Sequence, residues 1–447
     1  MNFIPHTEKD RQEMLKFLGL KSVDELFVDI DKRLILKKNL DLPEAMSELE
    51  LSKHMLTLSE KNGETLHKSC FLGAGAYNHF IPSIVNHVIS RSEFYTAYTP
   101  YQPEVSQGTL QAIFEYQTMI ANLTGMDVVN ASVYDGASAL AEAAIMTANI
   151  TDRNEIIISS TIHPEYRKVV KTYCNSHDLK LTEVSFDDGI TNLNDLKKNI
   201  SDRTAAVFIQ NPNFFGCIEN VLEIEKICHD KKALFVVSIV EPTSLGLLKA
   251  PGDYGADIVT GEGQSFGNPL SFGGPYFGFM GTKKEYMRYI PGRLSGMTVD
   301  SKGRRGFVLT LQTREQHIRR ERASSNICTN QALNALAAAV YLTSLGKSGL
   351  KEVANLCHQK AHYAFEKIKE IPGFEPVFKV PFYNEFVIEC PVKPEKLNEK
   401  LLEKNIIGGF NLEKFYPKLK NAMLFCVTEK NTKQEIDRLV KVMSGFK

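Results

Sequence analysis

The stretch PGDYGADIVTGEGQSFGNPLSFGGPYFGFMG, residues 251–281, decides how the rest of the chain is interpreted. An apolar run at Ile258 and Val259 enters a Gly-rich turn, and a second apolar run extends from Pro275 to Met280. In a parallel α/β sheet, such a turn lies at the carboxyl ends of strands, where side chains and backbone N–H groups meet a ligand. This stretch is therefore the first candidate for a functional site.

The residues before this stretch alternate between strand-like and helix-like patterns. Short apolar runs without strict alternation are typical of strands that are covered on both faces. Helical patterns separate most of these runs, which predicts a doubly wound α/β domain with a mainly parallel sheet. The predicted strands cover residues 128–133, 155–159, 181–186, 205–210 and 234–240.

The hydrophobic pattern at the two ends of the chain differs from that of the α/β region. Apolar residues at helical spacing before residue 60 predict helices that are too short to bury those faces alone, so we expect an arm packed on the main domain or on another subunit. After Gly306 we expect long helices over about 313–345 and 349–371, then a small α+β region. The predicted domains are an N-terminal helical arm (1–65), a large α/β domain (66–312), and connecting helices with a small C-terminal α+β domain (313–447).

Composition excludes several classes of function. Lys and Arg together number 53, and Asp and Glu together also number 53. The chain therefore has no net positive charge that would favour nucleic acid or an anionic membrane as a partner. The eight cysteines show no CxxC pair, which argues against a disulfide framework and a zinc site. The N-terminus has no apolar signal segment, and the weakly polar helix at 334–345 is too short to span a bilayer. We expect a cytoplasmic protein without a metal, acting on a small molecule or a protein partner.

Four stretches carry a resemblance to a known family: YTPYQPEVSQGTLQAIFEYQ (98–117), VNASVYDGASALAEA (129–143), residues 251–280, and TREQHIRRERASSNICTNQAL (313–333). Together they resemble the glycine cleavage system P-protein in its separate alpha-subunit form, over essentially the whole chain. The resemblance implies the aspartate-aminotransferase-like fold of pyridoxal phosphate (PLP) enzymes, fold type I. It also implies a beta subunit as partner, in a heterodimer or heterotetramer. Such a complex decarboxylates glycine and passes the aminomethyl group to the lipoyl group of the H-protein.

The resemblance also shows what this chain lacks. A PLP enzyme needs a lysine for the imine, a carboxylate at the pyridine nitrogen, and a helix N-terminus for the phosphate. Aligned on the PGD…GAD segment that both subunit types share, the cofactor lysine of the catalytic subunit falls at Ser265, and the neighbouring histidine falls at Gln264. By the same register, the aspartate that partners the pyridine nitrogen falls at Ser238. Serine supplies neither function, so we expect no PLP in this chain and PLP in the beta partner.

Two further positions are expected to be remnants of a cofactor site. The turn before the helix at Asp135–Ser138 has the form of an anion-binding turn, but an ordinary helix cap explains it equally simply, and we favour a cap or a remnant at Ser138. His163 follows the strand at 155–159, where related folds place a group that stacks on the cofactor ring. Lys283 and Lys284 are interpreted as surface lysines and not as substitute imine-forming residues.

The Pro-punctuated loop at 94–108 is the part of the chain most easily assigned a role at an interface. Its tyrosines could simply fill gaps in the core. Long irregular loops in compact domains tend to be functional, however, and the family resemblance places the active site at the subunit interface. We therefore expect the partner's active site, or the entrance for the lipoyl arm, to meet Tyr95, Tyr98, Tyr101 and Gln102.

Some alternatives stay open at this point. The basic cluster at 302–322 could dock the H-protein, or it could be a solvated helix face paired with Glu315 and Glu321. The chain could be a self-sufficient PLP-dependent lyase or desulfurase that uses another lysine. It could also be a purely structural pseudoenzyme subunit.

Overall fold

The computed structural model describes residues 5–62 and 67–446, and the chain divides into two units, residues 1–65 and 66–447. The first unit contains helices α1 (Glu8–Leu18) and α2 (Glu48–Glu60), and the 3₁₀ turn η1 (Val23–Phe27). Both helices begin with a capping box, Thr7 with Asp10 and Ser47 with Glu50. Neither helix has a buried residue, so these helices are stabilised by their local caps and not by a hydrophobic core of their own.

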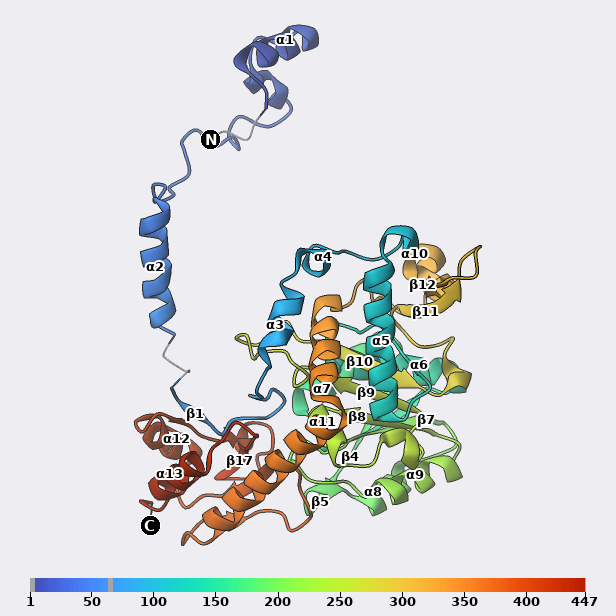
Figure 1. Cartoon of the computed structure of the whole chain (residues 1–447), viewed down its shortest axis with the longest axis vertical. Coiled ribbons are helices and arrows are strands. Elements are labelled where there is room, and N and C mark those ends of the chain that lie inside the picture. The colour runs from blue at the N-terminus through green and yellow to red at the C-terminus, as the bar shows by residue number, and fades with distance from the viewer. Residues whose placement is uncertain (1–4, 63–66, 447) are drawn as a thin grey trace. The chain divides into compact units, whose positions relative to one another are not determined.

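The second unit is built around a seven-stranded sheet in the order β2-β10-β9-β8-β7-β3-β4. Strands β10, β9, β8, β7 and β4 are labelled in Figure 1. All strands run parallel except β10, which is antiparallel to both of its neighbours. Every strand predicted before residue 251 is present, and the two apolar runs of the opening stretch form β9 and β10. The bounds are β2 Val128–Val129, β3 Glu155–Ser159, β4 Lys180–Val184, β7 Thr204–Gln210, β8 Leu234–Ile239, β9 Ile258–Glu262 and β10 Gly278–Thr282.

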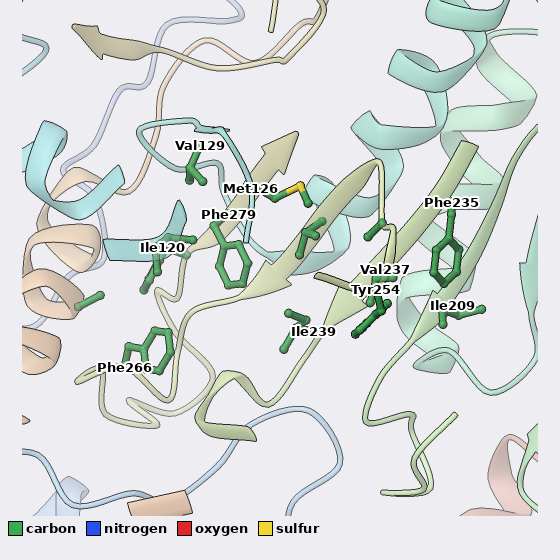
Figure 2. Close-up of a cluster of buried hydrophobic side chains, with 14 of the residues drawn as sticks. Ile120, Met126, Val129, Ile209, Phe235, Val237, Ile239, Tyr254, Phe266 and Phe279 are labelled. Atoms are coloured by element: carbon green, nitrogen blue, oxygen red, sulfur yellow. The ribbon is translucent and has the colours of Figure 1, made fainter. Parts of the chain in front are cut away.

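Both faces of this sheet are buried, as the continuous apolar runs predict. Alternate residues of one strand enter different clusters: Val207 and Ile209 face one side, and Ala206 and Phe208 face the other. The first side packs against α5 (Gln107–Thr124), α9 (Val221–Asp230) and α11 (Ala332–Lys369), and part of it is shown in Figure 2. The second side is covered by α6 (Gly136–Thr151) and α7 (Pro164–Ser176). Burying each large side chain fully contributes roughly 1.5–3 kcal/mol, so these two layers hold the strand ends in place.

The stretch from 313 to 331 corrects the sequence prediction, because it is not a long helix. It contains only the short pieces η6 (Gln312–Arg314), α10 (Gln316–Arg319) and η7 (Arg320–Arg322), and a hairpin of β11 (Leu294–Val299) and β12 (Arg305–Thr310) precedes it. The reason is tertiary. Tyr134 Oη accepts the N–H of Cys328, and Ser132 Oγ accepts the N–H of Gln331, so these donors are unavailable to a helical ladder. The long helix α11 begins at Ala332 and joins the two predicted helices across a kink at Gly346.

The C-terminal part is an antiparallel sheet in the order β13-β14-β17-β16, packed against α12 (Pro394–Leu402) and α13 (Lys433–Met443). Its strands are β13 Glu375–Pro376, β14 Glu385–Glu389, β16 Phe410–Asn411 and β17 Ala422–Cys426. Strand β1 (Ser69–Cys70) pairs in parallel with β15 (Ile406–Ile407), so the start of the second unit is tied to the C-terminal part. This arrangement matches the expected small α+β region.

Shorter elements complete the second unit. The loop at 94–108 is irregular apart from the end of α4, the 3₁₀ turn η2 and the first residues of α5. Helix α5 is capped by Gly125, whose backbone is in the left-handed region. No helix within the described ranges is long and apolar enough to cross a membrane. The remaining elements are α3 Ser83–Ile89, α4 Ser92–Tyr95, η2 Pro103–Val105, β5 Phe186–Asp187, β6 Ile190–Thr191, α8 Leu193–Asn199, η3 Pro242–Gly246, η4 Pro251–Tyr254, η5 Lys284–Tyr286 and η8 Leu412–Lys414.

Candidate functional site

The four suspected remnant positions follow, or lie in, parallel strands of the central sheet. Ser138 is in the first turn of α6, after β2, and His163 is the residue before α7, after β3. Ser238 lies in β8, and Ser265 follows β9. Because parallel strands end at the same edge of a sheet, the fold directs these positions toward the edge where such folds bind ligands.

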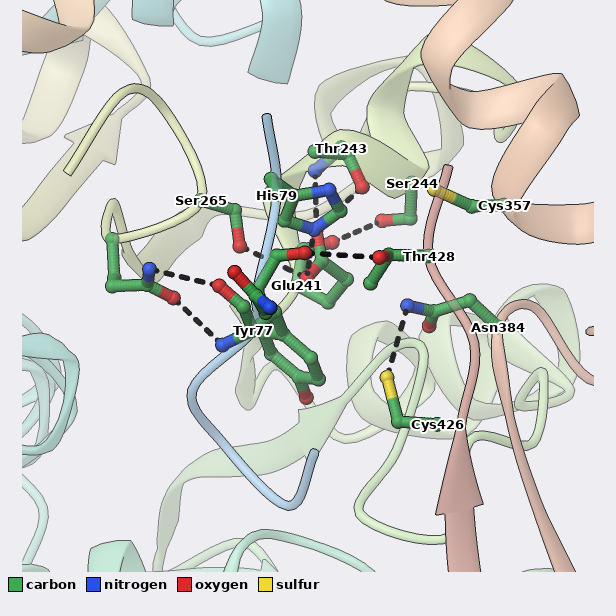
Figure 3. A network of polar contacts seen from close by, with 12 residues as sticks. Tyr77, His79, Glu241, Thr243, Ser244, Ser265, Cys357, Asn384, Cys426 and Thr428 are labelled. Atoms are coloured by element: carbon green, nitrogen blue, oxygen red, sulfur yellow. Dashed lines mark hydrogen bonds and ion pairs between the residues drawn. The ribbon is translucent and has the colours of Figure 1, made fainter. Parts of the chain in front are cut away.

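Ser265 is held by a carboxylate. Its Oγ donates to Glu241 Oε2 at 2.9 Å, and both residues are buried. The neighbouring Gln264 is also fully engaged, since its side chain exchanges two hydrogen bonds with the backbone of Tyr77. Figure 3 shows the contact between Ser265 and Glu241 together with Tyr77. The side chains of the Gly-rich turn are therefore bonded to Glu241 and Tyr77 of the same chain.

A buried histidine, His79, stands between two acidic residues, Glu241 and Glu429. His79 Nε2 lies 3.1 Å from Glu241 Oε2, a contact seen in Figure 3, and His79 Nδ1 lies 2.6 Å from Glu429 Oε2. Burial alone would lower the pKa of His79, but the charge of Glu241 and the hydrogen bonds to Cys357, Glu241 and Glu429 raise that pKa well above 6.5. Burial would also raise the pKa of Glu429, but the hydrogen bond and charge of His79 lower it to about 2. Each ring nitrogen of His79 faces a carboxyl oxygen, and this arrangement favours the protonated imidazole.

Two backbone N–H groups at the N-terminus of α6 are bonded to acidic side chains of the same chain. Asp135 Oδ1 accepts the N–H of Ser138 at 2.7 Å, which is an ordinary N-cap contact. Glu262 Oε2 accepts the N–H of Gly136 at 3.0 Å, and burial raises the pKa of Glu262 to about 8. Two of the N–H groups that could meet an anion are thus already bonded.

His163 is also covered by the chain. Its Nε2 donates to the carbonyl oxygen of Ala74 at 2.9 Å, and its Nδ1 accepts the N–H of Glu165. The backbone of Gly75 lies so close that a Cβ there would be 2.7 Å from His163 Nε2. Burial lowers the pKa of His163 to about 4, so the ring is neutral.

The other predicted positions are placed as follows. Ser238 is fully buried, and its Oγ has no hydrogen-bond partner among the described residues. Lys284 is exposed, as expected for a surface lysine. The same interpretation is wrong for Lys283, because its Nζ lies 2.6 Å from buried Asp257. In the basic cluster, Arg304 pairs with Asp300, and Arg305 lies over the ring of Phe307.

The side chains of the loop at 94–108 that were predicted to face a partner are largely exposed to solvent. Tyr95 is 64% exposed, Tyr98 is 86% exposed, and Gln102 is exposed as well. Tyr101 is anchored, because its Oη accepts a hydrogen bond from Arg293 Nη2 at 3.2 Å and its ring contacts His317. Within the described residues, no hydrogen bond or ring contact joins this loop to Ser138, His163, Ser238 or Ser265.

Sequence reasoning missed the charged residues of the site. Glu241 and Glu262 each stand where a buried apolar strand ends, and that placement was the available signal. No local pattern distinguishes His79. One ligand atom from each of His79, Cys357 and Glu429 lies within 4.8 Å of the others, a spacing compatible with a metal, but carboxylates already engage both His79 nitrogens.

Comparison with known proteins gives consistent results over the whole chain. The model of the glycine cleavage system P-protein family matches residues 1–443. A relative from Desulforamulus reducens, named probable glycine dehydrogenase (decarboxylating) subunit 1, is 54% identical over 439 residues, covering 98% of each chain. A crystal structure of glycine decarboxylase (P-protein) of the glycine cleavage system, in inhibitor-bound form, is similar with 43% identity and a TM-score of 0.91, covering 100% of each chain. A sphingosine-1-phosphate lyase from Burkholderia pseudomallei shares the fold at 13% identity, with a TM-score of 0.66 over 91% of this chain and 92% of that one. The expected aspartate-aminotransferase-like fold is confirmed.

Proposed function

The chain belongs to the glycine cleavage system P-protein family, and from that premise we propose that it is an alpha subunit without PLP, completed by a homologous beta subunit that holds the cofactor. Together the two chains decarboxylate glycine and pass the aminomethyl group to the lipoyl group of the H-protein. The assembly is a heterodimer or a pair of heterodimers. A cytoplasmic location is supported by the eight free cysteines, because thiols persist in a reducing compartment.

The observation that carries this proposal is the contact between Ser265 and Glu241. A cofactor lysine would stand at Ser265, yet a hydroxyl bonded to a buried carboxylate is found there, and a serine cannot form an imine. Ser238 has no ionisable group to keep a pyridine nitrogen protonated. The residues present therefore do not fit PLP, either at its aldehyde, which needs a lysine, or at its pyridine nitrogen, which needs a carboxylate.

The phosphate and the ring of PLP also lack a place. A phosphate at α6 would have to displace Glu262 from the N–H of Gly136. A ring stacked on His163 would meet the backbone of Ala74 and Gly75. The cofactor site of this chain is thus replaced by internal contacts, which favours a role in shaping the complex over independent catalysis.

A direct test uses the full-length chain purified alone and mixed with PLP. We expect no internal-aldimine absorbance and no adduct after borohydride reduction, as judged by intact-mass spectrometry. The same treatment of the co-purified two-chain complex should give one adduct, located on the beta chain. A stoichiometric adduct on a lysine of this chain would instead support the self-sufficient PLP enzyme.

A further inference from the structure

Two histidines on helix α11 lie next to each other, one helical turn apart. His358 and His362 are the only two of the 11 histidines in the sequence that are four residues apart. Residues at this spacing lie on the same face of a helix, and the centroids of the two rings are 4.1 Å apart. Within the described ranges, neither ring is hydrogen-bonded to a carboxylate, in contrast to His79.

Each of the two rings is held by a backbone carbonyl group. His358 Nδ1 lies 3.2 Å from the carbonyl oxygen of Tyr383. His362 Nε2 lies 3.2 Å from the carbonyl oxygen of Phe382. A carbonyl oxygen can only accept a hydrogen bond, so these two nitrogens carry the protons, and each ring in its neutral form has its lone pair on the other nitrogen. The lone pairs are therefore on His358 Nε2 and His362 Nδ1.

Both lone pairs are accessible from solvent. Among the described residues, neither His358 Nε2 nor His362 Nδ1 has a hydrogen-bond partner, and neither is one of the buried polar atoms that lack a partner. Both side chains are half-buried. The ring of His362 stacks on Phe382 with centroids 4.0 Å apart and planes 3° apart, which restrains its rotation. Burial lowers the pKa of His362 below 6.5, which keeps this lone pair free at neutral pH.

We propose that His358 and His362 together bind one divalent transition-metal ion, with water completing its coordination sphere. Neutral imidazole suits Zn²⁺, Cu²⁺ and Ni²⁺, whereas Mg²⁺ and Ca²⁺ prefer oxygen ligands. A metal-bound histidine almost always donates its other ring N–H to a carboxylate, a backbone carbonyl or water, and both rings already have such a bond. The ion needs one open lone pair from each ring and solvent for its waters, so no enclosed cavity is required.

The ion would stabilise the contact between α11 and the C-terminal sheet. The two carbonyl groups belong to the residues just before β14, whereas both metal ligands belong to α11. Fixing the two rings on the ion also fixes their N–H groups toward these carbonyl oxygens. Because the ion binds the folded chain, its presence should raise the melting temperature.

The test is equilibrium dialysis of the full-length chain against Ni²⁺, with the bound metal counted by inductively coupled plasma mass spectrometry. We expect saturable binding of one ion per chain. Zn²⁺ should displace Ni²⁺, and an excess of Mg²⁺ should not, because the site offers nitrogen and not oxygen. The melting temperature should rise with the concentration of Ni²⁺.

Two substitutions remove the lone pairs and keep the donors to the carbonyl groups. His358→Asn places an amide N–H where Nδ1 donates, and His362→Gln places one where Nε2 donates. Each should weaken Ni²⁺ binding at least tenfold, because loss of even an outer partner of a metal ligand costs 10–100-fold in affinity. His177→Gln, at an exposed histidine that follows α7, is the matched control and should leave binding unchanged. Thermal unfolding without metal checks that each variant is folded.

A spectrum of the wild-type chain identifies the ligands independently of the variants. Co²⁺ bound by two imidazoles and water should absorb in the visible range without a thiolate-to-metal charge-transfer band. Such a band would place the ion at a cysteine, for example Cys357 or the exposed Cys328, and would overturn the assignment. If either variant does not fold, this spectrum decides alone.

Three further results would overturn the assignment. These are no saturable binding up to about 1 mM Ni²⁺, unchanged binding in both histidine variants, and displacement of Ni²⁺ by Mg²⁺ as effective as that by Zn²⁺. None of these measurements involves PLP, glycine or the beta subunit, so this inference and the proposed function can fail independently.

Discussion

At the scale of single residues, His79 links two buried acidic residues of the candidate site. Its ring is buried between Glu241 and Glu429, and Ser265 bonds to the same Glu241 oxygen. Glu241, the acceptor of the Ser265 hydroxyl, thus belongs to a buried charge network that also contains His79 and Glu429. Removing one member of such a network leaves a buried charge without compensation, and that typically costs about 3–5 kcal/mol.

We therefore predict that His79→Gln lowers the free energy of unfolding by about 3–5 kcal/mol, measured by urea denaturation of the isolated chain. His87→Gln, at an exposed residue of α3, is the control and should change stability little. The double variant His79→Gln/Glu241→Gln should recover part of the loss because it also removes one uncompensated carboxylate. Equal stability of His79→Gln and the wild type would contradict the imidazolium assignment.

The same residues predict how stability varies with pH. The pKa of His79 is raised in the folded state, so its contribution is complete below the unfolded value of 6.5 and is lost as pH rises toward the folded pKa. The pKa of Glu429 is lowered to about 2, so its contribution is complete above the unfolded value of 4.5 and is lost as pH falls toward 2. We expect the contribution of this pair to be largest between pH 4.5 and 6.5. Urea midpoints measured across pH should decline above 6.5 in the wild type and less steeply in His79→Gln.

At the scale of elements, the loop at 94–108 is the segment whose role a partner would reveal. Tyr98 is exposed, and the hydroxyl of Tyr101 is bonded to Arg293, so the loop presents the Tyr98 side chain beside an anchored tyrosine. We predict that Tyr98→Phe and Tyr101→Ala, assembled with wild-type beta subunit, slow glycine decarboxylation measured as release of labelled CO₂. Tyr289→Phe, another exposed tyrosine outside the loop, should have no effect. Full activity of both loop variants would favour a purely structural subunit.

The same scale shows what the sequence could predict. The strands were predictable because a strand buried on both faces must be apolar throughout, as in β7 and β8. The stretch 313–331 was not, because its conformation depends on hydrogen bonds that its backbone N–H groups donate to Ser132 and Tyr134, which lie far away in the chain. The assignment of the cofactor lysine and aspartate positions to Ser265 and Ser238 stays a prediction, and nothing local in the sequence indicates that Ser265 and His79 meet at Glu241.

At the scale of the whole molecule, the contrast between the two units leads to the final prediction. The second unit contains every buried cluster of the described residues, whereas the first unit has none. More than half of the exposed large hydrophobic side chains belong to the first unit, including Phe17, Leu34 and Leu49. Apolar surface of that extent is typical of a segment that another surface covers.

We predict that deletion of residues 1–65 leaves the remaining chain folded, because its cores are independent of the deleted unit. Its circular dichroism spectrum and cooperative melt should match those of the full chain after correction for length. The truncated chain should, however, fail to co-purify with the beta subunit, and the full chain alone should bind a hydrophobic dye more strongly than the truncated chain does. Deletion of residues 1–46, which keeps α2, is the matched intermediate and tests whether that helix alone retains pairing. Stoichiometric complex formation by the chain that lacks residues 1–65, measured by size-exclusion chromatography with light scattering, would show that the first unit is not an assembly arm.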